Sequence, residues 1–365
     1  MKKVAVFFGG TSVEKEISVI TGVLTLNAID KTVYTPVPVY VSANGEFFTG
    51  EQLFDVEFYK NFSEKKLIKV AFLPGKNQLF AVKKKKIKPL FSLACVLNCM
   101  HGEGGEDGVV SAICKLHNIA CASPNLSFSA ISIDKYLSKL TLKGLKVNVV
   151  KGEIVGFSDD FNKKVAGLKY PLIVKPNRLG SSIGISVAKD GIQLKKALDL
   201  AFRFGEQALV EECLTDFIEI NCAVYENSKG ETVVSECERP KGKGSLLTFN
   251  DKYVLGEREF PAKIDAKLSS EIKRVSEKVY RTLGANGVIR IDYLVKNDKV
   301  YLNEINSVPG CLAYYLFSPT VKGFSCVIKE QIENALKRFA KSQTFVTGYA
   351  SSVLNLNGAK SAKRK

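Results

Sequence analysis

The chain has 365 residues, of which 45% are hydrophobic and 25% charged, and its formal net charge is +16. This length suits two or three domains, and no apolar run approaches the length of a membrane span, which argues against an integral membrane protein. The nine cysteines are irregularly spaced, without a C-x-x-C pair and with only two histidines in the chain, so we expect a reduced, cytoplasmic protein without a zinc site.

The N-terminal third predicts an α/β domain. Residues 4–8 form an apolar strand that is too short for a signal peptide and ends at two glycines, and apolar residues at helical spacing follow over 13–29. Further strands are expected over 34–42 and 92–102, and a helix over 108–119. A strand, a glycine turn and a helix in succession are typical of a Rossmann-like sheet. Residues 45–90 show no clear pattern.

The middle of the chain predicts α+β structure. A helix is expected from about residue 132 to 145, and the stretch 170–190 predicts two strands joined by a Gly/Ser turn. The elements expected next are a helix over 191–205, a strand over 207–214, paired strands over 217–227 and 231–240, and a helix over 269–284. Residues 240–260 are polar and contain glycine and lysine, which is typical of a lid or a disordered loop.

The stretch VIRIDYLVKNDKVYLNEINSVPG, from residue 288, predicts a hairpin with a polar cluster on one face. If its turn is centred on residue 298, Asp292 lies opposite Glu304 and Arg290 lies opposite Asn306. Two carboxylates and an amide oxygen suit a hard cation such as Mg²⁺, which often shares its ligands with phosphates. The alternative is a surface hairpin with salt bridges, so the metal interpretation requires phosphate-binding groups elsewhere in the chain.

The stretch VKPNRLGSSIGIS, from residue 174, is a candidate for those groups. Lys175 lies near the end of a buried strand, and backbone N–H groups of the turn at 180–184 can close over a triphosphate. The stretch is not a Walker A loop, because the Gly-Lys-Ser/Thr ending and the helix after it are missing. Taken alone, such a turn is more often structural.

The order of these motifs resembles the ATP-grasp superfamily, in which two α+β lobes hold ATP between them. Lys135, Lys175 with its Gly/Ser loop, the acidic strand end at 211–212 and the late hairpin occur in that order. The motifs GGTSVEKEIS, HGEGGEDG, NDKY and EINSVPG look like those of the D-alanine–D-alanine ligase family over most of the chain. The resemblance therefore implies an α/β protein with an ATP-grasp fold, preceded by a Rossmann-like parallel-sheet domain.

The resemblance also implies a division into domains. Residues 1–130 are expected to form the Rossmann-like substrate domain, and residues 131–211 the central ATP-grasp lobe. Residues 212–345 are expected to form the C-terminal lobe, which carries the lid loop 240–260 and the late hairpin. Residues 346–365 are expected to form a basic, disordered tail.

The resemblance implies ATP as a substrate and two Mg²⁺ or Mn²⁺ ions as cofactors. The lysines match groups that contact phosphates, and the acids of the 211–219 segment match groups at the adenine and ribose. The residues expected to bind ATP are Lys135, Lys175, Ser181, Ser182, Glu211, Glu212, Leu214, Glu219 and Lys252. The expected metal ligands are Asp292, Glu304 and Asn306.

The catalytic and substrate-binding roles are also implied by the resemblance. Arg290 and the N–H of Gly310 match the groups that stabilise the tetrahedral oxyanion, and Glu14 matches the acid that holds the ammonium of the first D-alanine, with His101 nearby. Lys252 and Tyr253 belong to the lid, where the tyrosine is expected to join Ser181 and Glu14 in a hydrogen-bonded trio. The acids at 106 and 107 are expected to organise their loop or cap the next helix.

The residue types suit this chemistry. Transfer of the γ-phosphoryl group to a carboxylate makes an acyl phosphate, and this transfer depends mainly on positioning and charge neutralisation by lysines and metal. The amine of a second amino acid then attacks, which requires a cation and an N–H donor for the oxyanion. A closing lid would protect the acyl phosphate from water.

The second-substrate position departs from the commoner pattern. A small hydroxyl five residues after the glycine binds the second D-alanine in the family, whereas this chain has Tyr315 there. The tyrosine at position 253 argues against D-lactate as the acceptor, but D-serine stays open, as does a related ATP-grasp ligase with another amino acid.

A different class of function is a non-catalytic protein on the same fold that binds a nucleotide or nucleic acid. Basic residues are scattered, with short runs at 83–88 and 361–365, and no recognised nucleic-acid-binding motif accompanies them. A basic surface also suits an anionic nucleotide substrate. The expected partners are therefore small molecules, ATP and D-alanine, with no membrane, with nucleic acid as a distant alternative and with a possible homodimer. The expected cellular role is peptidoglycan precursor synthesis.

Overall fold

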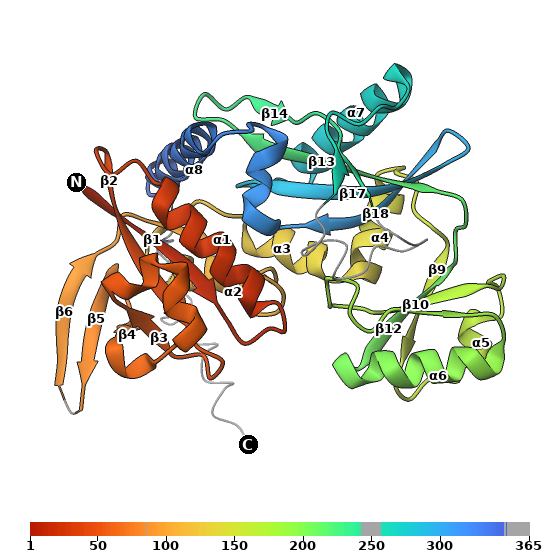
Figure 1. The fold of residues 1–365 in the computed structure, drawn as a ribbon, viewed down its shortest axis with the longest axis horizontal. Coiled ribbons are helices and arrows are strands. Elements are labelled where there is room, and N and C mark those ends of the chain that lie inside the picture. The colour runs from red at the N-terminus through yellow and green to blue at the C-terminus, as the bar shows by residue number, and fades with distance from the viewer. Residues whose placement is uncertain (85, 242–256, 347, 349–365) are drawn as a thin grey trace, which may run out of the picture.

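The fold was analysed in a computed structural model, which describes all residues except 85, 242–256, 347 and 349–365. Over these residues the chain forms an N-terminal α/β domain and two smaller α+β lobes that lie side by side (Figure 1). The α/β class expected from the sequence is observed.

The N-terminal domain is built on an eight-stranded sheet in the described chain, with the order β6-β5-β4-β3-β2-β1-β7-β8. β1 pairs in parallel with β2 and β7, and β7 with β8, whereas the other strands are antiparallel. The strands are β1 (Lys2–Gly9), β2 (Tyr34–Val41), β3 (Phe47–Thr49), β4 (Ile68–Phe72), β5 (Gln78–Lys83), β6 (Lys86–Ser92), β7 (Cys95–Asn98) and β8 (Ala120–Cys121). Short 3₁₀ turns lie at Glu51–Phe54, Val56–Asn61 and Glu64–Lys66.

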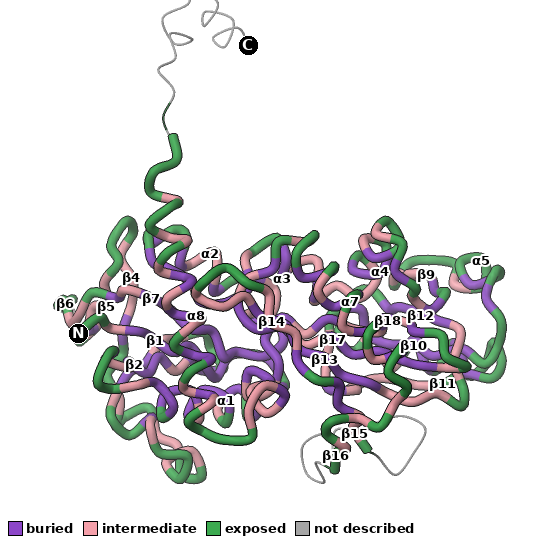
Figure 2. The backbone as a smooth tube through the Cα atoms, turned by 90° about the horizontal axis from the view of Figure 1, so that it is seen from above, coloured by how far each residue is buried: buried purple, intermediate pink, exposed green. Residues whose placement is uncertain are grey.

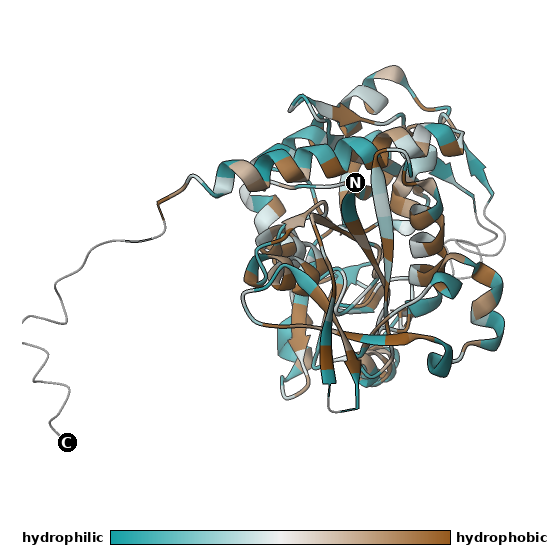
Figure 3. Ribbon diagram, turned by 90° about the vertical axis from the view of Figure 1, so that its left-hand side faces the viewer, coloured by the Kyte–Doolittle hydropathy of each residue, from teal (hydrophilic) through white to brown (hydrophobic). Residues whose placement is uncertain are grey.

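β1 is buried on both faces, which explains its uninterrupted apolar sequence. Val4, Val6 and Phe8 pack toward α1 (Lys15–Ala28) and α8 (Val321–Ser342). Ala5 and Phe7 pack in a second cluster with α2 (Val109–Leu116). Figure 2 draws β1 largely in the buried colour, and Figure 3 shows the hydrophobic colour on strands of the N-terminal domain.

α8 packs on the N-terminal sheet although it lies near the other end of the chain. Phe324, Ile328 and Ile332 belong to the same buried cluster as Val4 and Phe8. In Figure 1 this blue helix lies beside the red α1. The domain division expected from the sequence stays a prediction, and this packing shows only that the last helix contributes to the core of the N-terminal domain.

The central lobe is an antiparallel sheet with the order β11-β10-β12-β9. One face is covered by short helices, whose apolar residues share one core cluster with the strands. The elements are β9 (Gly152–Gly156), α5 (Phe161–Val165), β10 (Leu172–Pro176), β11 (Ser186–Ala188), α6 (Gly191–Ala201), a 3₁₀ turn (Phe202–Phe204) and β12 (Gln207–Glu212).

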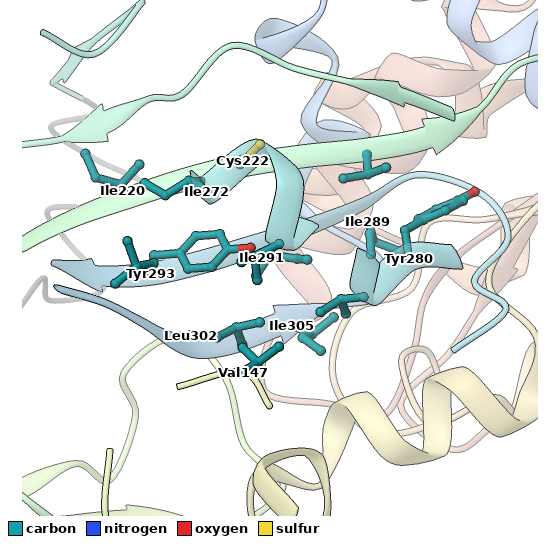
Figure 4. Packing of buried hydrophobic residues seen from close by; sticks show 14 of the residues in the cluster. Val147, Ile220, Cys222, Ile272, Tyr280, Ile289, Ile291, Tyr293, Leu302 and Ile305 are labelled. Carbon is teal, nitrogen blue, oxygen red and sulfur yellow. The ribbon is translucent and has the colours of Figure 1, made fainter. Parts of the chain in front are cut away.

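The C-terminal lobe carries the late hairpin in an antiparallel sheet with the order β14-β13-β17-β18. Its core contains Tyr280 and Tyr293 with isoleucines from the strands, as Figure 4 shows. The elements are α3 (Leu126–Ile133), α4 (Lys135–Gly144), β13 (Ile218–Glu226), β14 (Thr232–Val234), β15 (Arg239–Pro240), β16 (Arg258–Glu259), α7 (Ala266–Thr282), β17 (Ile289–Lys296), β18 (Lys299–Asn306) and a 3₁₀ turn, η6 (Gly310–Leu316).

Two expectations about single elements need correction. The helix expected from 132 to 145 is two helices, α3 and α4, because Asp134 is extended and its carboxylate caps α4 by accepting from the N–H of Leu137 at 2.9 Å. The expected strand 231–240 shortens to β14 and the two-residue β15. β3 to β6, which lie in the region without a clear sequence pattern, form the antiparallel extension of the N-terminal sheet.

Among the described residues, no single helix has the length and apolar character needed to cross a membrane. One pair of helices, η6 and α8, meets the criterion only together and is bent by 115°.

Candidate active site

The late hairpin has the predicted register at its polar end. Arg290 lies opposite Asn306 and Asp292 opposite Glu304. The turn itself is centred between Asn297 and Asp298, both of which have positive φ, as a two-residue type I′ turn requires. A bulge between Asp292 and the next residue restores the predicted pairing. The predicted register is therefore confirmed, but by a tighter turn combined with a bulge.

The bulge brings one residue into the site that strand alternation would not place there. Leu302 and Ile305, three positions apart, are both buried in the core on the same side of the hairpin (Figure 4). Asn303 and Glu304, which lie between them in the sequence, both line a pocket between the central and C-terminal lobes. The Oδ1 of Asn303 accepts a hydrogen bond from the Nζ of Lys175 at 3.1 Å.

The polar face of the hairpin is held by charge-assisted hydrogen bonds. Arg290 donates from Nε and Nη2 to the two carboxylate oxygens of Asp292, at 2.7 and 2.9 Å. The Nδ2 of Asn306 donates to Oδ2 of the same carboxylate at 3.1 Å. Such two-pronged pairing fixes both partners more firmly than a single contact would.

Lysines from the other elements face this hairpin. The Nζ of Lys135, the first residue of α4, lies 2.7 Å from Oε1 of Glu304 and donates to the carbonyl of Leu179 at 2.8 Å. The start of α4 is tied to the end of β10, because Asn177 accepts from the backbone N–H groups of Lys135 and Tyr136 at 3.0 Å each. This contact places the cation at the junction of the two lobes.

Lys175 and Lys139 share one buried carboxylate. The Nζ of Lys175 lies 2.7 Å from Oε2 of Glu211, and the Nζ of Lys139 lies 2.5 Å from Oε1. Burial would raise the pKa of Glu211, but the two lysines outweigh burial and hold it below its ordinary value. Glu211 is therefore ionised at neutral pH.

A pocket of about 250 Å³ lies between the central and C-terminal lobes. One end is polar and contains Lys135, Lys175, Asp292 and Glu304. Apolar side chains that suit a flat, largely apolar base also line the pocket, namely Val150, Ile173, Leu209, Leu214, Phe217 and Leu294. Of the residues expected to bind ATP, this pocket brings together Lys135, Lys175, Ser182, Glu211, Glu212, Leu214 and Glu219.

A second, polar pocket of about 40 Å³ adjoins the first and shares Lys135, Leu179, Gly180 and Glu304 with it. The expected residues that line it are Glu14, His101, Ser181, Arg290, Asn306 and Gly310. The hydroxyl of Ser181 donates to Oε1 of Glu14, which is only 5% exposed. The size of this pocket and the buried carboxylate of Glu14 suit a small molecule with an ammonium group.

His101 contacts the loop that carries Gly310 through a threonine. Thr21 Oγ1 lies 3.0 Å from Nε2 of His101 and accepts from the backbone N–H of Cys311 at 3.0 Å. Burial lowers the pKa of His101 to about 4, so the ring is neutral at neutral pH. Residues 311–313 have φ near +50°, a left-handed conformation that costs about 1–2 kcal/mol per residue and must be held by such contacts.

The acids at 106 and 107 organise their loop, as expected, and Glu106 does more. Asp107 accepts from the N–H groups of Gly104 at 2.8 Å and Val109 at 3.0 Å. Glu106 accepts from the N–H of Gly102 at 3.0 Å and from the N–H of Val308 at 3.1 Å, which joins the N-terminal domain to the late loop. Burial, with the nearby charge of Glu14, raises the pKa of Glu106 to about 8.

Tyr315 contacts Arg290 but is not among the described residues that line the smaller pocket. Its hydroxyl oxygen lies 3.5 Å from Nη1 of Arg290, and the guanidinium of Arg258 lies over its ring at 4.3 Å from the centroid. Arg258 also lies 3.7 Å from the buried carboxylate of Glu238. Burial raises the pKa of the Tyr315 phenol.

Lys252 and Tyr253, with most of the expected lid 240–260, lie outside the described residues, as does most of the expected tail 346–365. The hydrogen-bonded trio is thus described only for its Glu14–Ser181 pair.

Sequence reasoning missed Lys139 and Asn303. Lys139 lies one helical turn after Lys135, a spacing that places both on one face of α4 and that was available as a signal. Asn303 had no such signal, because only the bulge turns it toward the pocket.

The protein groups alone supply only part of the ligands that a hard cation needs. No group of three or more His, Cys, Asp or Glu residues suited to a metal occurs in the described ranges. Asp292, Glu304 and the amide of Asn306 provide two carboxylates and one amide on adjacent strands, and cationic side chains already pair with both acids. Such a site suits Mg²⁺ that completes its ligands with substrate phosphates and water.

The chain is similar to known proteins over most of its length. The model of the D-Ala-D-Ala ligase N-terminus matches residues 3–124, and that of the C-terminus matches residues 146–334. A D-alanine–D-alanine ligase of Thermosipho melanesiensis is 37% identical over 350 residues, covering 93% of this chain and 95% of the relative. One from Nitratiruptor is 34% identical and covers 99% of both chains.

Solved structures show the same likeness. The D-alanine–D-alanine ligase of Helicobacter pylori is 28% identical with a TM-score of 0.74, covering 92% of this chain and 98% of that one. The VanG D-Ala:D-Ser ligase of Enterococcus faecalis is 26% identical with a TM-score of 0.77, covering 92% and 99%. The ligase of Coxiella burnetii, at 21% identity and a TM-score of 0.80 over 99% of both chains, shows the shared fold.

Proposed function

The chain belongs to the D-alanine–D-alanine ligase family, and on this premise we propose that its two adjoining pockets hold ATP and D-alanine during ligation. The protein is an ATP-dependent ligase that joins two D-alanines into D-alanyl-D-alanine, with ADP and phosphate as the other products. The observation that carries the assignment of the pockets is that Lys135 and Glu304 line both of them. A phosphoryl group can therefore pass from one pocket to the other.

We assign the first half-reaction to the boundary between the pockets, where Lys135 and Glu304 line both of them. Glu14, held by Ser181, would pair with the ammonium of the first D-alanine and leave its carboxylate facing Lys135 and Arg290. An oxygen of that carboxylate attacks the γ-phosphorus of ATP, the bond to the β-phosphate oxygen breaks, and ADP and an acyl phosphate form. Lys135 and Lys175 would neutralise the phosphate charge during this transfer.

Asp292, Glu304 and Asn306 would hold two Mg²⁺ or Mn²⁺ ions, and this assignment is a proposal that rests on their oxygen donors. Bound there, the ions would supply charge neutralisation on the transferring phosphate.

The second half-reaction joins the two amino acids. The amine of the second D-alanine attacks the acyl carbon, the amide bond forms, and the bond to phosphate breaks. The tetrahedral oxyanion would be stabilised by Arg290 and by the N–H of Gly310, both of which border the smaller pocket. Thr21 would help to hold the left-handed turn after Gly310 through the N–H of Cys311.

The remaining roles are proposals that rest on the family resemblance. The ATP-binding role extends to Ser182, Glu211, Glu212, Leu214 and Glu219, and closure of the lid would add Lys252 and Tyr253. A homodimer, a cytoplasmic location and the supply of a peptidoglycan precursor belong to the same expectation.

The acceptor is the finest point of the proposal. Tyr315 replaces the small hydroxyl expected at the acceptor site, and one similar structure is a D-Ala:D-Ser ligase. We propose D-alanine as the main acceptor, with the phenol of Tyr315 or a reshaped pocket serving its carboxylate. D-Serine is the second candidate because of these two observations.

The test is product mass after incubation with ATP, Mg²⁺ and pairs drawn from a panel of D-amino acids and D-hydroxy acids. We expect D-alanyl-D-alanine as the main product, with one phosphate released per dipeptide. A panel in which D-alanine is neither donor nor acceptor would overturn the proposed substrate. ATP hydrolysis without any condensed product would overturn the ligase reaction itself.

A further inference from the structure

We propose that Lys139 is a positioning residue for the nucleotide site, because it shares the carboxylate of Glu211 with Lys175 and so leaves a net positive charge for the triphosphate. The inference rests on the proposed ATP site and adds a residue to it. Lys139 would act through Glu211 and Lys175, which would touch the nucleotide.

The three charged groups form a compact, buried row. Each oxygen of Glu211 takes one lysine, at 2.5 Å for Lys139 and 2.7 Å for Lys175. The side chains of Lys139, Glu211 and Lys175 are 5%, 1% and 10% exposed. All three line the large pocket, so the charge of the whole group acts on a ligand there.

The fold holds these residues from three different elements. Lys175 on β10 and Glu211 on β12 lie diagonally across an antiparallel pair, since Ile173 is opposite Glu211 and Lys175 is opposite Leu209. Lys139 reaches the same carboxylate from α4, whose start is fixed by the cap at 134 and by Asn177. The carboxylate therefore joins the helix of one lobe to the sheet of the other.

The charges explain why a second lysine is useful. A Lys175–Glu211 pair alone would be neutral, and its cation would be drawn onto the acid rather than toward a phosphate. Lys139 pairs with one carboxylate oxygen of Glu211, and the two lysines and the acid together carry one net positive charge. Burial of a charged lysine costs free energy that pairing only partly offsets. A residue that merely filled space at position 139 would therefore be more stable as an apolar side chain.

The pKa values of the two lysines are shifted in opposite directions. Burial lowers the pKa of Lys139, against the opposing charge of Glu211. Burial also acts to lower the pKa of Lys175, but the charges of Glu211, Glu304 and Glu219 together outweigh it and the pKa of Lys175 is raised. Lys175, which also contacts Asn303, thus stays charged beside the polar end of the pocket.

The test compares the affinities of ATP and adenosine by calorimetry in the full chain. The ratio of the two dissociation constants isolates the contribution of the phosphates from that of the base. For K139M we expect ATP affinity to fall about 10- to 100-fold, the range expected when a charge-assisted contact is lost, with adenosine affinity changed by less than about threefold. K139R keeps the charge and should restore most of the ratio.

Two further variants separate positioning from structure. K143M removes an exposed lysine from the same helix and should leave the ratio unchanged. K139M/E211Q removes the acid together with its partner, so Lys175 is no longer neutralised and the ratio should return toward that of the natural chain. In this double variant Lys175 is the one remaining charge of the three groups, and circular dichroism reports folding in each case.

The outcomes separate this inference from the proposed function. A K139M variant that changes ATP and adenosine affinity in equal proportion, or a double variant whose ratio stays as far from that of the natural chain as the ratio of K139M, would overturn the role of Lys139 in directing Lys175. The predicted pattern of ratios in a protein that makes no D-alanyl-D-alanine would support the inference and overturn the proposed substrate. Failure of the natural chain to bind ATP at all would overturn both.

Discussion

Replacing Glu304 with glutamine removes a charge from the wall between the two pockets with little change of shape. Glu304 is 21% exposed and lies 2.7 Å from the Nζ of Lys135. A hydrogen bond to a charged acceptor contributes about 1.5–3 kcal/mol, whereas one to a neutral acceptor contributes about 0.5–1.5 kcal/mol. Because the new amide side chain keeps an acceptor oxygen, E304Q should lose about 1–2 kcal/mol of unfolding free energy, or about 1–3 °C in Tm for a chain of this length.

The effect on turnover should be far larger than the effect on stability. The carboxylate is proposed to hold a metal ion that neutralises the transferring phosphate, and loss of one such stabilising group typically costs about 10²–10³ in rate. We expect kcat of E304Q to fall by about 10²- to 10³-fold. ATP affinity measured without divalent ions should stay within about threefold, because Lys135 keeps its charge.

The measurements are phosphate release and dipeptide mass across a Mg²⁺ titration, ATP binding without metal, and thermal unfolding. The matched control is E277Q, which removes the acid of an exposed pair with Arg281, at 3.2 Å, on the helix α7, whose residues do not line either pocket. Such surface pairs contribute about 0–1 kcal/mol, so E277Q should turn over at the wild-type rate. If E304Q keeps more than about a tenth of wild-type turnover at saturating Mg²⁺, its metal-binding role is wrong.

Three other changes test the smaller pocket and its surroundings. H101Q should flatten the pH dependence of stability, because His101 gains a proton near pH 6.5 in the unfolded chain but only near pH 4 in the folded chain. The unfolding free energy of the wild type should fall by up to about 3 kcal/mol as the pH drops through this window. Equal changes of unfolding free energy with pH in the two proteins would contradict this. S181A removes the hydroxyl that donates to Glu14 and should raise the KM of the first D-alanine by about 10- to 100-fold, with the KM of ATP as the internal control. Y315F removes the phenol oxygen beside Arg290 and should raise the KM of the second D-alanine more than that of the first; equal effects on both would argue against an acceptor role.

Local patterns determined much of the fold and the candidate site. The alternation of Arg290, Asp292, Glu304 and Asn306 with apolar neighbours places them on one face of a hairpin, and the structure has that arrangement. The short apolar run at 4–8 identifies a buried central strand. These features depend on side-chain periods of a few residues, which are readable without knowledge of distant contacts.

Residues 45–90 show why other parts could not be read. β6, for example, is mostly exposed, so its sequence lacks the alternation that marks a half-buried strand. Its place is set by backbone pairing with β5 at the edge of the sheet. Backbone hydrogen bonds leave little trace in side-chain identity.

The sequence by itself determined the order of the motifs, the oxygen-rich hairpin and membership of a ligase family. Only the tertiary structure decided that a bulge turns Asn303 toward Lys175, that Lys139 meets Glu211 across the lobes, and that α8 covers the N-terminal sheet. The physical reason is distance along the chain. Local periodicity fixes which way a side chain points, but a contact between remote segments depends on packing of the whole fold, and many apolar sequences would satisfy the same packing.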